Sequence, residues 1–192
     1  RRRWIPRIPP GAAAVLRRLQ LPAPELVLPG AQGLEPREAL LPVLQDVRRT
    51  YPDIQLRLAG PSLNSTEREI IRNYGLDNVV VEEGHVSDGR LASLYAHSVA
   101  LLHPSLHEGF GIPLLEAMDC GTVPIATAST SVPEVLGDAG IHVHPDNMEA
   151  GFREAMLDLL GNPDQRDSKA RECRERSKAF NWEMASRKTF EV

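Results

Sequence analysis

Residues 99–126 read VALLHPSLHEGFGIPLLEAMDCGTVPIA, and this stretch indicates the fold. It opens and closes with short apolar runs, 99–102 and 123–126, whose length and β-branched residues suit buried strands. Between them, Pro113 is well placed as the first residue of a helix that runs to about Cys120. A strand, a helix and a second strand in this order predict one unit of a parallel sheet.

The same alternation extends over most of the chain. Further apolar runs of this character lie at 25–28, 54–59, 79–81 and 141–143. Segments with helical spacing separate the runs, and the strongest, 152–160, places apolar residues at i, i+3, i+4, i+7 and i+8. The chain is therefore predicted to be α/β, with a doubly wound, parallel, six-stranded Rossmann-like sheet and helices on both faces.

The two ends of the chain differ from this middle. Residues 1–24 are rich in proline, which fixes φ and removes a hydrogen-bond donor, so they are predicted to be an extended linker. The predicted domain covers 25–179, and 180–192 is predicted to form a last helix with an aromatic stripe. A chain that opens on a linker without an initiator Met is expected to be a fragment of a longer protein.

The composition excludes several classes of protein. A hydrophobic fraction of 42% is too high for a disordered chain, and no uninterrupted apolar run approaches the ~18 residues of a membrane span. Only two cysteines occur, Cys120 and Cys173, which excludes a disulfide scaffold and fits a reducing compartment. With 26 acidic against 22 basic residues, no nucleic-acid partner is expected. The expected location is the cytoplasm, including the inner face of the membrane as a peripheral protein.

The loop after the fourth predicted strand is where we expect a ligand, because ligands of open α/β sheets bind at the carboxyl ends of the strands. Gly109 and Gly111 let the backbone turn tightly and approach a ligand. The following helix would direct free amides and the positive end of its dipole toward a phosphate. Glu108 and Glu116, the latter in the first helical turn, suit hydroxyl groups instead. The pattern therefore predicts a nucleotide sugar as the ligand, because its phosphates lie between hydroxyl-rich rings. The simpler alternative is a glycine-rich turn followed by a helix with an acidic residue in its first turn.

The run 108–135, EGFGIPLLEAMDCGTVPIATASTSVPEV, resembles the signature of the family 4 retaining glycosyltransferases of GT-B fold. Weaker similarities extend over nearly the whole chain, at 8–11, 34–37, 58–60, 84–87 and 180–183. Members have two Rossmann-like domains, the second of which binds the nucleotide-sugar donor. The resemblance implies that this chain is the C-terminal, donor-binding domain. It also implies that an N-terminal acceptor domain is missing, and that 180–192 would cross back to it.

The resemblance also assigns roles to individual residues. It implies that Glu108 is the catalytic residue, bonded to the hydroxyls of the donor sugar, and that Glu116 holds the ribose hydroxyls. The other donor-binding candidates are Gly109, Phe110, Gly111 and Ile112 against the sugar and diphosphate, His85 and Val86 at the base, and Arg37 at the diphosphate. Such enzymes need no metal or other cofactor, although the spacing of His103 and His107, or of His142 and His144, could hold a metal. His107, next to Glu108, is the histidine expected near the sugar.

Two positions depart from the family pattern. Glu38 stands where a basic residue usually follows Pro-Arg, and Gln32 stands where an earlier arginine is often seen. Both departures remove positive charge from the place where the diphosphate leaves, although Glu38 also suits the solvated first turn of a helix over 36–50. Two functions stay open. One is hexose transfer from a GDP-mannose or UDP-sugar donor to a glycan or lipid, with this fragment inactive alone. The other is a catalytically impaired nucleotide-sugar-binding or scaffolding domain.

Overall fold

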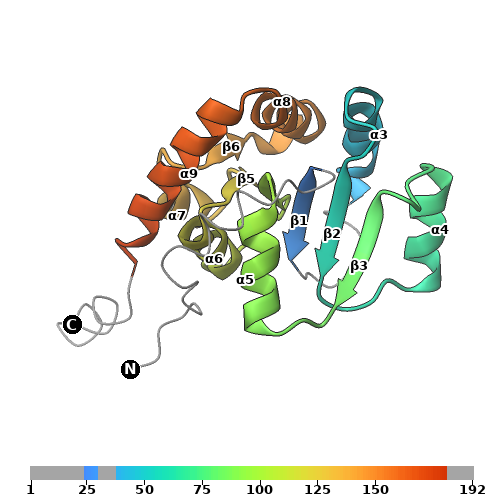
Figure 1. The fold of residues 1–192 in the computed structure, drawn as a ribbon, viewed down its shortest axis with the longest axis horizontal. Coiled ribbons are helices and arrows are strands. Elements are labelled where there is room, and N and C mark those ends of the chain that lie inside the picture. Colours follow the sequence, from blue (N-terminus) through green and yellow to red (C-terminus); the bar gives the residue numbers. More distant parts are fainter. Residues whose placement is uncertain (1–23, 30–37, 181–192) are drawn as a thin grey trace.

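A computed structural model of the chain describes residues 24–29 and 38–180, in which strands and helices alternate (Figure 1). The strands are β1 Glu25–Pro29, β2 Gln55–Ala59, β3 Val80–Gly84, β4 Ala100–His103, β5 Val123–Thr127 and β6 Ile141–Val143. The helices are α3 Leu41–Thr50, α4 Ser65–Asn73, α5 Asp88–His97, α6 Ile112–Cys120, α7 Val132–Leu136, α8 Met148–Gly161 and α9 Pro163–Ser177, with a 3₁₀ turn at Pro145–Asn147. No described helix is long and apolar enough to cross a membrane.

All six strands form a single parallel sheet in the order β3-β2-β1-β4-β5-β6. The chain winds outward from β1 to β3, returns through α5 to β4, and then winds the other way. Because such crossovers are right-handed, the helices that lead from β1 to β3 cover one face, and those that lead from β3 to β6 cover the other. Accordingly, α5 packs beside α6, whereas α8, which follows the last strand, returns to pack beside α3. The predicted doubly wound α/β sheet is confirmed, and its order reverses between β1 and β4, where ligands of such sheets bind.

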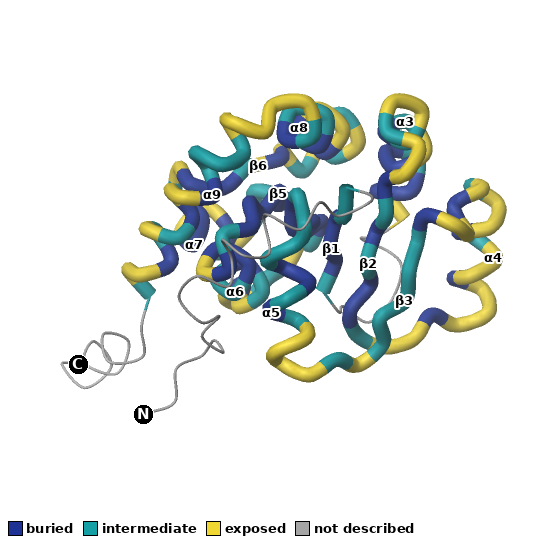
Figure 2. Tube along the Cα trace, viewed as in Figure 1, coloured by how far each residue is buried: buried dark blue, intermediate teal, exposed yellow. Residues whose placement is uncertain are grey.

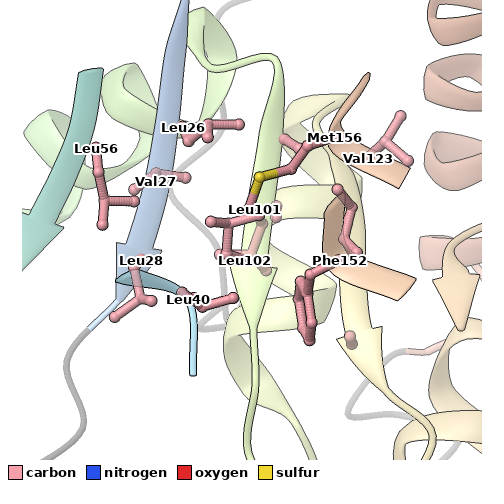
Figure 3. Packing of buried hydrophobic residues seen from close by; sticks show 14 of the residues in the cluster. Leu26, Val27, Leu28, Leu40, Leu56, Leu101, Leu102, Val123, Phe152 and Met156 are labelled. Carbon is pink, nitrogen blue, oxygen red and sulfur yellow. The ribbon is translucent and has the colours of Figure 1, made fainter. Parts of the chain in front are cut away.

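The core lies on both faces of the central strands (Figure 2). Every residue of β4 and β5 is buried, as the short apolar runs predicted for strands covered on both sides. From α8, Phe152 and Met156 reach the core with no exposed surface (Figure 3). The apolar face predicted over 152–160 is turned inward in α8, although Leu160 is only partly buried.

The start of α3 corrects a prediction. A helix over 36–50 was expected, but α3 begins at Leu41, with Pro42 in its first turn. Proline has no N–H, so inside a longer helix it would break the bond to the carbonyl four residues earlier, whereas in a first turn this loss costs nothing. Glu38 therefore lies ahead of α3; it is helical and exposed, and a turn at 39–40 separates it from α3. The predicted linker and the predicted last helix lie outside the described residues, apart from Pro24 and Phe180.

Candidate functional site

The loop of residues 104–111, here the β4–α6 loop, joins the end of β4 to the start of α6. Gly111 is the N-cap of α6 and has φ 84°, in the left-handed region that favours glycine. A Cβ at this position would also lie 2.9 Å from Cδ1 of Leu114. Ile112 is therefore the first helical residue, and Pro113, predicted to be first, is the second. Both the backbone turn and the close packing explain why glycine stands here.

Glu108 is held at both of its carboxylate oxygens. The Gly111 N–H donates to Oε1 over 3.2 Å, and Nε2 of His103 lies 3.0 Å from Oε2. His103 is buried at the end of β4, and this burial lowers its pKa, although the nearby Glu108 opposes the shift. Because a carboxylate only accepts, Nε2 of the neutral ring must carry the hydrogen. Glu108 is thus placed at the N-terminus of α6 with its side chain 25% exposed.

The histidine that contacts Glu108 is not the one expected. His107, predicted to lie near the sugar because it is adjacent in sequence, is exposed. His103, five residues before Glu108, makes the contact because it ends a buried strand whose carboxyl end faces the loop. A histidine that ends a buried strand just before the glutamate is the signal that could have found it.

Glu116 faces α5 and bonds to a buried tyrosine. The hydroxyl of Tyr95 donates to Oε2 of Glu116 over 3.3 Å, and Tyr95 is 1% exposed. Burial raises the pKa of the Glu116 carboxyl, although the hydrogen bond from Tyr95 opposes the shift. Burial and the nearby carboxylate raise the pKa of the Tyr95 hydroxyl. Because α6 begins at Ile112, Glu116 lies in the second helical turn. The prediction that it lies in the first turn is wrong.

The outer edge of the β4–α6 loop is exposed and apolar. Gly109 is exposed, and Phe110 and Ile112 expose 47% and 38% of their surface. The Phe110 ring meets the Phe180 ring edge to face, with 6.2 Å between their centroids, and the Arg176 guanidinium lies 5.0 Å from the centroid of Phe180. This edge is therefore open to a ligand while Phe110 is anchored to the segment after α9.

The residues predicted to contact the base follow a different strand, β3. His85 is exposed and Val86 half-buried directly after β3, in the turn where Ser87 caps α5. In the sheet β2 and β1 lie between β3 and β4, so His85 and Val86 follow a strand three places away from β4, at the same sheet edge as the β4–α6 loop. Arg37 and Gln32 lie outside the described residues.

The described residues contain no group of three or more His, Cys, Asp or Glu that could hold a metal ion. Of the two histidine pairs considered, His103 is bonded to Glu108, and Nε2 of His142 lies 2.6 Å from the Gly137 carbonyl. Nε2 of His142 donates this bond, because a carbonyl only accepts. That the protein works without a metal stays a prediction.

The doubly wound parallel sheet defines a Rossmann-like domain, with the N-terminus of α6 at the carboxyl edge of the sheet. Residues 37–180 match the family described as glycosyl transferases group 1. The chain therefore belongs to this family, and its fold is that of the C-terminal domain of the GT-B glycosyltransferases. The family resemblance and the fold drawn from the sequence are confirmed.

Known relatives agree with this assignment. O-antigen chain mannosyltransferase B of Escherichia coli is 30% identical over 193 residues, which cover 97% of this chain and 50% of that protein. A sucrose-phosphate synthase of Thermosynechococcus elongatus superposes with a TM-score of 0.77 at 26% identity, over 93% of this chain and 47% of that one. The chain thus spans about half the length of these relatives.

The chain also superposes on the structure of an isolated domain of similar length. The C-terminal domain of a group 1 glycosyl transferase, LpcC, of Francisella tularensis superposes with a TM-score of 0.72 over 92% of this chain and 94% of that domain. At 19% identity this likeness concerns the fold alone. The fold of this chain thus matches that of a domain of similar length.

Proposed function

We propose that this chain is the donor-binding domain of a retaining, metal-independent hexosyltransferase. The donor is a nucleoside-diphosphate sugar of GDP-mannose or UDP-sugar type, and the acceptor is a glycan or lipid bound by a separate N-terminal domain. The observation that carries the proposal is the Glu108 carboxylate, held by His103 and Gly111 at the N-terminus of α6. The mannosyltransferase name of a relative supports mannose as the first sugar to test.

The geometry supports a division of the ligand along the sheet edge. Hydroxyl groups of the donor sugar donate to Glu108, whose oxygens keep lone pairs beyond those bonded to His103 and Gly111. The diphosphate lies against the start of α6, where the helix dipole and backbone amides favour an anion and stabilise its departure. The ribose hydroxyls bond to Glu116, and the base lies toward His85 and Val86.

The first test is binding of nucleoside diphosphates to the chain. Titration with GDP, UDP and ADP by calorimetry should show weak binding of at least one of them. An assay with the matching nucleotide sugar and an acceptor should show no transfer, because groups of the other domain are needed to position the reactants. Binding of none of the three would refute the proposed function, and transfer by this chain alone would refute the two-domain requirement.

A second candidate function is nucleotide-sugar binding without catalysis. The observation that favours it is Glu38, which is exposed and lies between the carboxyl end of β1 and α3. Because β1 and β4 are parallel neighbours, this position shares the sheet edge with the start of α6. A carboxylate there repels a diphosphate where the family usually places a positive charge.

Replacing Glu38 with lysine tests whether this charge acts on the ligand. Exposed ion pairs are worth about 0.2–1 kcal/mol, and exchanging repulsion for attraction counts this energy twice, so diphosphate affinity should rise about twofold to thirtyfold. The gain should shrink as salt rises, and a nucleoside without phosphates should show none. Glu69→Lys is the matched control, since Glu69 is an exposed residue on α4. Equal effects of both changes at low salt would mean that Glu38 does not face the diphosphate.

A further inference from the structure

Two loops of the sheet edge are joined by hydroxyl groups. Residues 128–131, here the β5–α7 loop, follow β5 and supply three consecutive hydroxyl side chains. The Glu108 N–H donates to Oγ1 of Thr130 over 3.1 Å, and the same hydroxyl donates to the Glu108 carbonyl over 2.9 Å. Ser131 also donates to this carbonyl over 3.2 Å, and Ser129 donates to the Ser105 carbonyl over 3.0 Å. The backbone of Glu108 is thus held from the neighbouring loop.

The backbone of Thr130 is strained where it makes these bonds. Its φ is 45°, and within the described residues it is the one non-glycine residue with a positive φ. A β-branched side chain is disfavoured in this region, and such strain persists where the surrounding structure holds it. Here the holding contacts are the hydrogen bonds to Glu108.

The β4–α6 loop needs an external support because of its own sequence. Gly109 and Gly111 flank Phe110, and glycine leaves the backbone more conformations than any other residue. The Glu108 side chain is fixed at its far end by His103 and Gly111, but those bonds alone leave the main chain of Glu108 free to rotate. Thr130 restricts this rotation, because its hydroxyl is hydrogen-bonded to both the N–H and the C=O of Glu108.

We propose that Thr130 is a positioning residue, whose hydroxyl fixes the main chain of Glu108 so that the carboxylate meets the donor sugar in one orientation. The inference rests on the proposed function in that Glu108 is taken to bind the sugar. In this role Thr130 acts through Glu108 and not on the ligand directly. Its loss should therefore affect the part of the ligand that Glu108 senses, the sugar, and leave the nucleoside diphosphate unaffected.

The test compares Thr130→Val with Thr130→Ser in the 192-residue chain. Valine keeps the β-branched shape but leaves the Glu108 N–H without this acceptor, whereas serine keeps the hydroxyl. Thr130→Val should weaken binding of the nucleotide sugar about tenfold and change nucleoside-diphosphate affinity less than about twofold. Thr130→Ser should restore both affinities. Thr130→Gly, which lacks the hydroxyl but relieves the strain, should show the same selective loss if the valine variant folds poorly.

Amide hydrogen exchange at Glu108 gives a second readout that needs no ligand. Exchange of the Glu108 amide should be faster in Thr130→Val than in the unchanged protein. In Thr130→Ser it should be as slow as in the unchanged protein. If the unchanged protein binds no nucleotide sugar while exchange responds in this way, the proposed function fails and the support of Glu108 stands. If Thr130→Val binds the nucleotide sugar as the unchanged protein does, or loses both ligands equally, the positioning role is overturned and the proposed function remains.

Discussion

Replacing Phe152 with alanine should lower the free energy of unfolding by about 3–5 kcal/mol, the largest effect that we expect from a single change. Phe152 has no exposed surface and is among the largest fully buried side chains. It projects into the core (Figure 3), and α8 packs against α3, β5 and β6. Removing the ring takes away its contacts and leaves a cavity that rigid neighbours fill only in part.

Urea unfolding measures this change as a lower midpoint with an unchanged slope. Leu160→Ala is the matched control on α8, because Leu160 belongs to the same apolar face but is only partly buried. Its cost should be less than half that of Phe152→Ala, since less apolar surface is returned to water. Equal costs for the two variants would mean that the core does not close around Phe152.

The strands were predictable because their signal is local. Runs such as 123–126 are apolar on both faces, and a strand covered by helices on both sides requires this pattern. The start of α3 was predicted too early because the charged residues before it suit a helix, whereas Pro42 limits how far the helix extends backward. The pairing of β1 with β4 depends on the path of the crossovers, which no short stretch of sequence encodes.

The candidate site was predictable where its chemistry is local and not where packing assembles it. The place of Gly111 was predictable because the turn into α6 requires glycine, and Glu108 stands directly before that turn. Two partners were missed, that of the Glu116 carboxylate and that of the Glu108 main chain, because Tyr95 comes from α5 and Thr130 lies 22 residues from Glu108 in the chain. Only the arrangement of α5, α6 and β5 around β4 brings these side chains together.

Replacing Glu116 with alanine should weaken binding of a nucleoside diphosphate by about 1–3 kcal/mol, the range for a lost hydrogen bond to a charged acceptor. Binding that needs the charged carboxylate is present above its pKa and lost as pH falls through it. Burial raises the pKa of Glu116, so the loss should come at a higher pH than for an ordinary glutamate. Tyr95→Phe removes a hydrogen bond that lowers this pKa, and should move the loss to still higher pH.

Glu108→Ala should instead leave nucleoside-diphosphate affinity unchanged and weaken only the sugar-bearing donor. The difference follows from placement, because Glu108 lies ahead of α6 among His103 and Gly111, whereas Glu116 lies in the second turn beside Tyr95. Each variant is titrated with a nucleoside diphosphate and with its sugar conjugate, which makes every protein its own control. Equal losses for both ligands in both variants would mean that the carboxylates do not divide the ligand. A loss confined to the sugar conjugate in Glu116→Ala would mean that the two roles are reversed, with the sugar lying against α5.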